Sequence, residues 1–287
     1  MIKALLQTMR LKQWSKNIFI FGALVFDKKL FVLDHLFRTL AAFAMFCLLS
    51  SVVYIINDVG DIEKDRQHPV KRNRPLASGR LKPSVAMGAA ASILVVLLPL
   101  AFALDVGFGL IALAYLVNNV LYTFWLKDVV IIDVLSVAGG FVLRVGAGVA
   151  VIPTERFSPW IYVCMTLLAL FLGFGKRRHE LALLTADANN HRRVLDDYSL
   201  PFLDEMMGVV TASTVMAYAI YTFSAEGLPS NHSMMLTVPF VLYAIFRYLY
   251  LIHVRGEGGA PEEILLSDRP FLLDVTLWGV LVVILLY

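Results

Sequence analysis

The chain has 287 residues, of which 59% are hydrophobic and 16% are charged, and its formal net charge is +3. Soluble domains carry about 25% charged residues, so the composition excludes a soluble enzyme and predicts an all-α polytopic membrane protein. The two cysteines, Cys47 and Cys164, lie in apolar runs and lack the paired spacing of a metal or redox motif. We interpret both as packing residues.

The first 17 residues are basic and have apolar residues at helical spacing, which is typical of a helix on the membrane surface. The apolar run that follows, 18–26, is only nine residues long. It can cross the bilayer only if Trp14, Lys16 and the lysines after the run reach the two interfaces. We therefore expect a short first span here, with no cleaved signal peptide before it.

Eight longer apolar runs follow, each near the length of about 17 to 25 residues that a helix needs to cross a bilayer. They occupy 40–56, 85–104, 106–126, 129–151, 160–175, 207–223, 234–252 and 271–287. The connections between them leave no room for a soluble domain. The pattern thus predicts one transmembrane domain over 1–287, with nine helices.

Nine spans place the two termini on opposite sides of the membrane, and the distribution of positive charge orients them. With a cytoplasmic N-terminus, nineteen of the 25 lysines and arginines lie in inner segments and four in outer segments. The two longest polar connections, 57–84 and 176–205, then both face the cytoplasm. We expect the active site on that side.

The most charged stretch, 57–82, has four acidic and seven basic residues in 26 positions at the end of an apolar run. On a helix, Asn57, Asp61 and Asp65 advance in steps of four, and Asp58 lies on nearly the same face. Carboxylates stacked in this way repel one another unless a cation lies between them, and Mg²⁺ prefers such oxygen ligands. The pattern favours a Mg²⁺ site over a helix end that only meets lipid headgroups and water.

Residues 57–65 read NDVGDIEKD, which resembles the NDxxDxxxD motif of the UbiA superfamily of intramembrane prenyltransferases. Further segments are similar to its decaprenyl-phosphate phosphoribosyltransferase branch: RLKQWSKN at 10–17, HPVKRNRPLASG at 68–79, WLKDVVIIDVLSVAGGFVLRVGAG at 125–148, GKRRHE at 175–180 and GGAPEEILLSDR at 258–269. Together they cover the chain nearly from end to end. The resemblance implies a UbiA-type bundle of nine transmembrane helices around a central cavity, in a bacterial inner membrane.

The resemblance also implies a reaction, in which 5-phosphoribosyl 1-diphosphate donates 5-phosphoribose to a polyprenyl phosphate such as decaprenyl phosphate, for a cell-wall arabinan precursor. Mg²⁺ would be bound by Asn57, Asp58, Asp61 and Asp65, and the three aspartates would act in catalysis as the C1–O bond breaks. The lipid phosphate is already an anion, so it needs no general base. The substrate-binding residues would be Lys16, Asn17, Asn57, Arg72, Tyr122, Lys127, Asp133, Arg144, Lys176, Arg177 and Glu180.

One segment departs from the prenyl-diphosphate enzymes of the superfamily, which usually carry a second aspartate motif after the sixth span. Here that place reads Lys176, Arg177, Arg178, His179 and Glu180, and Asp187 follows only later. We therefore expect a direct cationic grip on phosphate there instead of a second metal site. Such a grip suits a sugar donor that carries phosphate at both ends.

Asp133 and Arg144 are charged residues within a predicted span, where a charge normally faces a partner or a wet cavity. They are eleven residues apart and share a helix face about 16 Å apart, too far to pair directly. Each either binds substrate or pairs with a neighbouring helix. Tyr122 either bonds substrate or is an interfacial aromatic residue. Close helix packing is predicted at the glycines of this span, Gly139, Gly140, Gly146 and Gly148.

Patterns of other chemistries are missing from the sequence: no Ser, His and acid form a nucleophilic triad, and there is no GxxxxGK[ST] phosphate loop. Two rival functions stay open. A prenyl-diphosphate:acceptor prenyltransferase of quinone, haem or ether-lipid type would need a second acidic cluster near Asp187. A transporter of a phosphorylated lipid or sugar would favour functional charges on both membrane faces. We expect no nucleic-acid partner, and the sequence fixes neither polyprenyl length nor oligomeric state.

Overall fold

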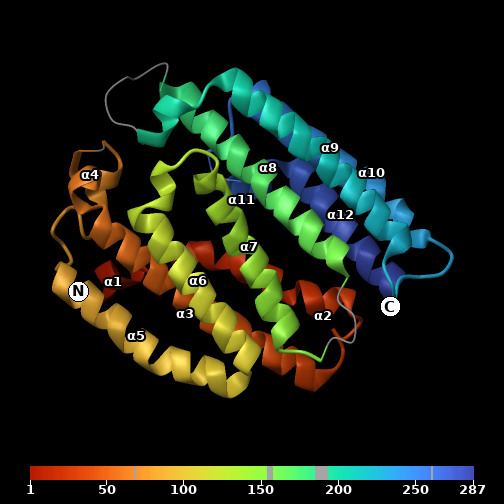
Figure 1. Cartoon of the computed structure of the whole chain (residues 1–287), viewed down its shortest axis with the longest axis horizontal. Coiled ribbons are helices and arrows are strands. Elements are labelled where there is room, and N and C mark those ends of the chain that lie inside the picture. The colour runs from red at the N-terminus through yellow and green to blue at the C-terminus, as the bar shows by residue number, and fades with distance from the viewer. Residues whose placement is uncertain (68, 154–157, 185–192, 260) are drawn as a thin grey trace. The chain divides into compact units, whose positions relative to one another are not determined.

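The computed structural model describes residues 1–67, 69–153, 158–184, 193–259 and 261–287, without the side chains of residues 184, 193 and 261–263. All regular secondary structure within these ranges is helical, which confirms the predicted fold class. The chain divides into two compact units (Figure 1). The first comprises Met1–Leu24 with Lys29–Thr154, and the second comprises Val25–Lys28 with Glu155–Tyr287. The assignment of the two units to one domain remains a prediction.

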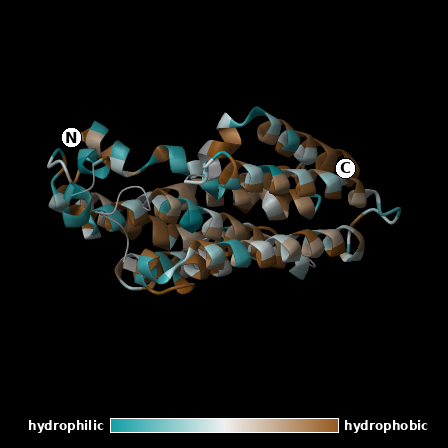
Figure 2. Cartoon of the chain, turned by 90° about the horizontal axis from the view of Figure 1, so that it is seen from above, coloured by the Kyte–Doolittle hydropathy of each residue, from teal (hydrophilic) through white to brown (hydrophobic). Residues whose placement is uncertain are grey.

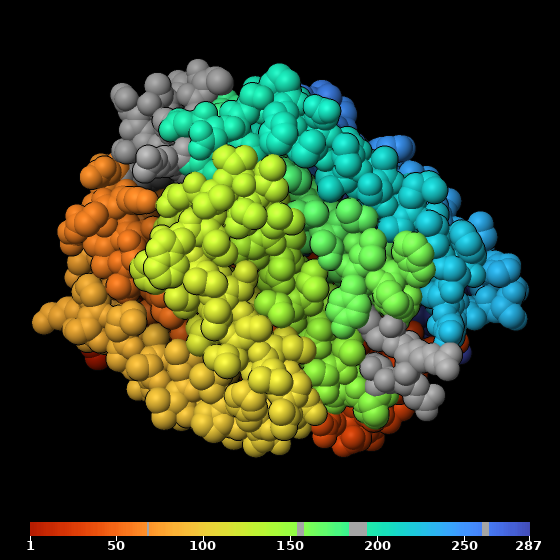
Figure 3. All heavy atoms as spheres, in the orientation of Figure 1, coloured from red at the N-terminus to blue at the C-terminus, as the bar shows by residue number. Residues whose placement is uncertain are grey.

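The first unit is built around α3 (Leu33–Gly60), which packs against α5 (Pro83–Leu104) and α6 (Val106–Phe124). α7 (Ile132–Ala150) packs against α6 and against the 3-10 helix η1 (Leu11–Phe21). In Figure 3 the side chains of α5 and α6 form much of the visible face of this unit. The shorter elements are α1 (Ile2–Thr8), α4 (Ile62–Gln67), η2 (Lys71–Asn73) and η3 (Leu126–Asp128).

The second unit contains four long helices. α8 (Pro159–Leu184) packs along α9 (Leu200–Ser224), and α10 (Val238–His253) packs against both α9 and α12 (Arg269–Leu286). The shorter elements are η4 (Arg193–Asp197), η5 (Ser233–Thr237) and α11 (Pro261–Ser267). The short helix α2 (Gly22–Phe26) lies where the sequence passes between the two units.

Eight helices in the described part of the chain are long and apolar enough to cross a membrane, and they coincide with the eight longer apolar runs. These helices are α3, α5, α6, α7, α8, α9, α10 together with η5, and α12. Figure 2 shows hydrophobic residues along the helices and hydrophilic residues gathered near the N-terminus and in the connections. The chain is therefore a multi-pass membrane protein.

The predicted first span, 18–26, does not form a long α-helix, so the count of nine is not confirmed. It falls in η1, whose 3-10 turns rise about 2.0 Å per residue, and in the short helix α2. The four residues of the run that lie in η1 and the five in α2 together extend over about 16 Å, less than the hydrocarbon thickness of about 30 Å. The apolar run is too short to supply a full α-helical span.

Local sequence explains where several helices begin. Pro83 lies in the first turn of α5. A backbone N–H has no intrahelical partner at this position, so the N–H that proline lacks costs no hydrogen bond. Asp105 caps α6, because its carboxylate accepts a hydrogen bond from the backbone N–H of Phe108 at 2.9 Å. Asp268 caps α12 in the same way, by accepting from the N–H of Phe271 at 2.9 Å.

Gly148 allows α7 to approach η1 closely, which confirms the predicted close packing at this glycine, whereas the prediction is wrong at Gly139, where a β-carbon would meet nothing within 4 Å. A β-carbon at this position would lie 1.9 Å from the carbonyl oxygen of Ile20, a backbone atom that cannot rotate away. We expect Gly148→Ala to lower the free energy of unfolding by at least about 1 to 3 kcal/mol, as overpacking does. The measurement is thermal unfolding of the purified protein in detergent.

Gly139→Ala is the matched control on the same helix, since a β-carbon there meets nothing within 4 Å. Alanine has the higher helix propensity, so this variant is expected to unfold at the same temperature as the parent or slightly higher. An unchanged unfolding temperature for Gly148→Ala would contradict the close approach of α7 to η1.

Candidate functional site

The acid-rich stretch lies at the end of α3, and the helix expected through Asp65 is interrupted within it. α3 ends at Gly60, Asp61 follows with φ −103° and ψ 9°, and α4 begins at Ile62. This break divides the acidic side chains into two groups with different partners. Asp58 and Asp65 form one group, and Asp61 with Asn57 forms the other.

Two arginines hold the first group. The Arg74 guanidinium donates to Asp65 at 2.7 Å and to Asp58 at 3.3 Å, and so bridges the two carboxylates. Arg10 forms an ion pair with the same oxygen of Asp58. The Asp58 side chain is only 3% exposed, whereas Arg10 and Arg74 are 27% and 28% exposed. Asp58 is therefore clamped between two cations inside the protein.

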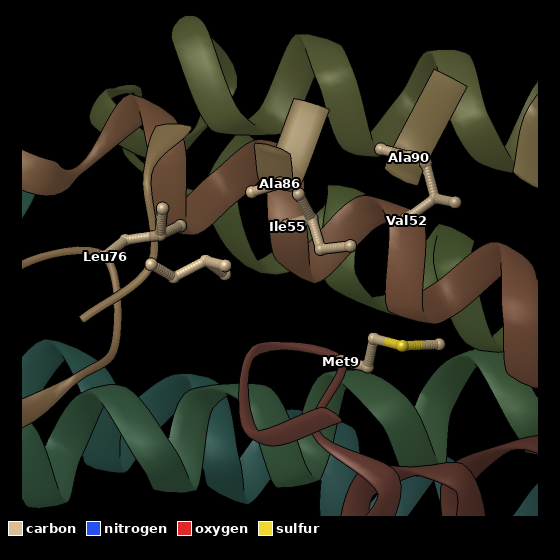
Figure 4. Close-up of a cluster of buried hydrophobic side chains, with 7 residues drawn as sticks. Met9, Val52, Ile55, Leu76, Ala86 and Ala90 are labelled. Atoms are coloured by element: carbon tan, nitrogen blue, oxygen red, sulfur yellow. The ribbon is translucent and has the colours of Figure 1, made fainter. Parts of the chain in front are cut away.

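Both arginines are close in sequence to members of one buried apolar cluster, part of which Figure 4 labels. Leu76 and Leu81, each 2% exposed, belong to this cluster with Ile55 of α3 and connect the loop that follows α4 to that helix. Met9 belongs to the same core cluster, next to Arg10, whose backbone turns the chain with φ 51° between α1 and η1. A left-handed backbone costs a non-glycine residue roughly 1 to 2 kcal/mol. This cluster holds the Arg10 and Arg74 segments against the end of α3.

The second group reaches the connection between α6 and α7. Lys127 of η3 donates to Asp61 at 2.7 Å, and the side chains of this pair are 11% and 20% exposed. The Thr123 hydroxyl, at the end of α6, donates to the amide oxygen of Asn57 at 3.4 Å. The structure thus brings the predicted phosphate-binding residue Lys127 directly to a predicted metal ligand.

The donor chemistry of this cluster fits Mg²⁺, which proteins commonly hold with one or two carboxylates plus substrate phosphate and water. In the described residues, no three or more His, Cys, Asp or Glu side chains form a ready metal cage. Asp58, Asp61 and Asp65 are paired with three cationic side chains, so the cluster is close to electrically neutral by itself. Mg²⁺ would therefore enter most favourably together with the negative charge of a phosphate ligand.

Deeper in the first unit, Arg144 of α7 is 6% exposed and has three neutral hydrogen-bond acceptors. Its Nε donates to the amide oxygen of Asn17 at 2.8 Å, one Nη donates to the Gly140 carbonyl at 2.8 Å, and the other donates to the Tyr115 hydroxyl at 2.7 Å. Asn17 is fully buried and donates in turn to Ser50 of α3. Three elements, η1, α6 and α7, meet at this guanidinium, and Asn17 connects it to α3.

The other predicted residues of the first unit have different surroundings. Asp133 is fully buried in the first turn of α7, where the helix dipole favours an acid. Lys16 is half-buried on η1. Tyr122 is half-buried on α6, and Arg72 is exposed on η2.

The remaining predicted residues belong to the second unit, on the C-terminal half of α8. Arg177 is 3% exposed and donates to Glu180 at 2.6 Å, one helical turn away. Lys176 is half-buried, and Arg178 pairs with Asp204 of α9. Asp187, the candidate for a second acidic cluster, lies outside the described residues.

The second unit also contains a tight ion pair near the start of α12. Arg247 donates two hydrogen bonds to Asp268, at 2.7 and 3.1 Å. These bonds lower the pKa of Asp268 below its ordinary value of 3.8. The stabilisation is fully present above 3.8 and is lost as the pH falls through the lowered pKa.

We therefore expect Asp268→Asn to lower the unfolding temperature at pH 7, and the difference from the parent to shrink at about pH 2. Thermal unfolding at both pH values measures this difference. Asp197→Asn, at an exposed carboxylate of the same unit, serves as the control and is expected to change neither value. An equal difference at both pH values would contradict the ion pair.

Some residues of these clusters were not singled out from the sequence, or were given another role. Arg74 was expected, with Lys71, Arg72, Arg80 and Lys82, to contact phosphate, and Arg10 only lies in a segment quoted for the family resemblance. Nothing in their local sequence indicates which carboxylate they contact. Tyr115 lies within an apolar run, and the residue that could have marked it is Asn119, one turn further along α6, whose side chain donates to the Tyr115 carbonyl at 2.8 Å. Thr123 could have been found from Asn119, which lies one turn earlier on the same face of α6. The Asn119 carbonyl accepts a hydrogen bond from the Thr123 hydroxyl.

The chain resembles known proteins over nearly its whole length. It is 31% identical to a decaprenyl-phosphate phosphoribosyltransferase of Corynebacterium glutamicum, over 100% of this chain and 86% of that protein. It is 30% identical to a decaprenyl-phosphate phosphoribosyltransferase of Mycobacterium tuberculosis, over 97% of this chain and 92% of that protein.

The fold is also similar to a solved structure of a UbiA homologue from Archaeoglobus fulgidus bound to GPP and Mg²⁺. The two share a TM-score of 0.73 and 20% sequence identity, and the match covers 99% of each chain. The family model of the UbiA prenyltransferases matches residues 18–262, which include the acidic cluster, Arg144 and the basic segment of α8. This chain belongs to the UbiA prenyltransferase family.

Proposed function

We propose that the protein transfers 5-phosphoribose from 5-phosphoribosyl 1-diphosphate to a polyprenyl phosphate, giving polyprenyl-phosphoryl 5-phosphoribose and diphosphate. The observation that carries this proposal is the similarity of 30 to 31%, over nearly the whole chain, to decaprenyl-phosphate phosphoribosyltransferases. The composition of the site supports it, because acidic and cationic side chains meet at the end of α3. We place this end on the cytoplasmic side of a bacterial inner membrane, where the soluble donor is available.

In this proposal the end of α3 binds the diphosphate of the donor. Asn57, Asp61 and Asp65 would hold Mg²⁺, which when bound neutralises the negative charge that develops on the leaving diphosphate. Lys127 and Arg74 already contact Asp61 and Asp65, so both cations can turn to phosphate oxygens that arrive beside these carboxylates. The side chains therefore exchange carboxylate contacts for phosphate contacts as the donor binds.

Asp58 has a different part in the proposal. It is the most buried of the three carboxylates, and two guanidinium groups engage it from two separate segments. We assign it to positioning Arg10 and Arg74 in addition to any contact with metal. No side chain needs to act as a general base, because the acceptor phosphate is already ionised when it attacks C1.

The donor carries a further phosphate on C5, and we assign Lys176 to a donor phosphate. Arg177 is buried and paired with Glu180, which leaves it to orient this part of α8. Lys176→Ala is expected to raise the KM for 5-phosphoribosyl 1-diphosphate about tenfold or more, by removing a charge-assisted contact. Initial-rate kinetics over donor concentration measure this, and an unchanged KM would remove Lys176 from the donor site.

A prenyltransferase that uses a prenyl diphosphate is the second candidate. It is favoured by the similarity in fold to a UbiA homologue bound to GPP and Mg²⁺. It would need acidic ligands for a second metal, and the part of α8 that the structure describes carries Lys176, Arg177 and Arg178 at that place. We therefore rank it below the phosphoribosyl transfer.

The decisive experiment incubates the purified full chain with Mg²⁺, radiolabelled 5-phosphoribosyl 1-diphosphate and polyprenyl phosphate. Label that moves into the organic phase, and only when Mg²⁺ and the lipid are both present, is the expected result. A parallel reaction offers geranyl diphosphate and an aromatic acceptor. Product in the parallel reaction alone would replace the proposed function by that of a prenyltransferase.

A further inference from the structure

The stretch that follows α10, which we call the 254–259 connection, lies directly against α8 within the second unit. Its contact is with His179, the residue after the bases at 176–178. A β-carbon on Gly258 would lie 2.9 Å from the β-carbon of His179, and a β-carbon on Gly259 would lie 3.0 Å from Cδ2 and from Nε2 of its ring. Two consecutive glycines therefore let the backbone of the connection lie on the His179 side chain.

Hydrogen bonds to α10 fix the course of the chain on both sides of these glycines. Gly256, with φ +67°, turns the chain after the end of α10 in a conformation that favours glycine. The N–H of Glu257 then donates to the carbonyl of Leu251 at 2.9 Å, so the turn folds back on α10. Further along, Asp268 accepts two hydrogen bonds from Arg247 of the same helix. These anchors hold the connection against His179.

The face of α8 that meets the connection also packs closely against α10. Gly175 and His179 are four residues apart and therefore lie on one face of α8. A β-carbon on Gly175 would lie 2.8 Å from Cδ1 of Ile252, and a β-carbon on Gly258 would lie 3.3 Å from Cγ1 of the same side chain. α8, α10 and the connection thus meet at Ile252, which leaves the backbone of α8 little room to shift there.

Lys176, which we assign to a donor phosphate, lies within this turn of α8. It is three residues from His179, so the two side chains are neighbours on the helix surface. On another side of the same turn, Arg178 pairs with Asp204 of α9. The backbone that carries Lys176 is therefore held from α9 by an ion pair and from the connection by the contact with His179.

We propose that the contact of Gly258 and Gly259 with His179 positions Lys176, and so sets the affinity of the protein for the phosphorylated sugar donor. The three residues are positioning residues, since they act through the lysine. The proposal rests on the proposed function, because it takes Lys176 to bind a donor phosphate. The contact acts on the donor alone, so the affinity for the polyprenyl phosphate is expected not to depend on it.

The size of the expected effect follows from the geometry. Contacts of 3.4 to 4 Å are ordinary, so a β-carbon on Gly259 requires the His179 ring or the connection to move by a few tenths of an ångström. Charge-assisted hydrogen bonds are short, about 2.7 to 2.9 Å, and a shift of this size weakens them. The flexible lysine stem absorbs part of the shift. We therefore expect weaker donor binding, not its loss.

The test compares the Michaelis constants of the purified full chain for its two substrates. For Gly259→Ala we expect the KM for 5-phosphoribosyl 1-diphosphate to rise about threefold to tenfold. Its kcat and its KM for polyprenyl phosphate are expected to stay within about twofold of the parent, since a contact that ground state and transition state share changes KM at constant kcat. Initial rates of label transfer to the lipid, over each substrate in turn, give these values.

Two double variants test the path of the effect. In a Lys176→Ala chain, Gly259→Ala is expected to change the donor KM by less than about twofold, because the lysine through which it acts is gone. In a His179→Ala chain it is expected to have equally little effect. The atoms of the described residues that the new β-carbon would crowd are Cδ2 and Nε2 of His179, and alanine lacks both.

Two further variants complete the experiment. Gly208→Ala, on α9 of the same unit, is the matched control, because a β-carbon there meets nothing within 4 Å. Both of its KM values are expected to equal those of the parent. His179→Ala by itself carries the test if Gly259→Ala fails to fold. It is expected to raise the donor KM about threefold, because it removes the ring on which the connection lies.

The outcomes separate this proposal from the proposed function. If Gly259→Ala and His179→Ala lower the unfolding temperature but leave the donor KM unchanged, the contact is only structural and the positioning role is wrong, while the proposed function stands. An equal rise of both KM values, or an undiminished effect of Gly259→Ala in the Lys176→Ala chain, would overturn the positioning role as well. If the parent transfers no label from 5-phosphoribosyl 1-diphosphate, the proposed function fails, and this proposal fails with it.

Discussion

Asp65→Asn is expected to abolish turnover while the protein still inserts and folds. The Asp65 side chain is 6% exposed, and its carboxylate contacts Arg74 at 2.7 Å. An amide keeps the shape but removes the negative charge that would hold Mg²⁺ and orient Arg74. We expect kcat to fall at least about a hundredfold to a thousandfold, the range observed when one charge-stabilising contact is removed. Asp61→Asn is expected to behave alike, because Asp61 holds Lys127 in the same way.

The measurement follows label transfer to the lipid over a range of Mg²⁺ concentrations. Glu63→Gln is the matched control, since Glu63 lies on the same short helix α4 but is 80% exposed and pairs only with the exposed Arg66. That variant is expected to keep the activity of the parent. Normal Mg²⁺-dependent activity in Asp65→Asn and Asp61→Asn would remove both residues from the metal site.

Asp58→Asn is expected to act mainly on stability. The substitution leaves two guanidinium groups, those of Arg10 and Arg74, without their shared carboxylate oxygen. Breaking a buried ion pair costs about 3 to 5 kcal/mol, and we expect roughly 2 to 3 kcal/mol here because both arginines are about a quarter exposed. The unfolding temperature in detergent should therefore fall by several degrees.

Asp34→Asn provides the control for this variant, at the opposite end of the same helix α3. Its side chain is 78% exposed, so its loss is expected to leave the unfolding temperature unchanged. Equal stability of Asp58→Asn and the parent would show that the clamp by Arg10 and Arg74 contributes nothing.

The sequence by itself determined the class of the protein and most of its helices. Eight of the predicted apolar runs became helices long enough to cross a membrane, because hydropathy over about 20 residues is a local property of the chain. The sequence also determined the acidic motif at 57–65, since all of its residues lie in one short stretch of the chain. It left 18–26 undecided, because a run of nine apolar residues is too short to decide between a span and an irregular helix.

Only the tertiary structure decided which side chains meet. Arg10 reaches Asp58 across 48 positions of sequence, and Arg144 reaches Asn17 across 127. Such contacts depend on how helices pack, and packing is fixed by the shapes of whole helix faces such as the one at Gly148. The sequence therefore showed that Arg144 is an expensive charge in a span. The fold showed that the charge has neutral partners, because no carboxylate among the described residues is packed against it.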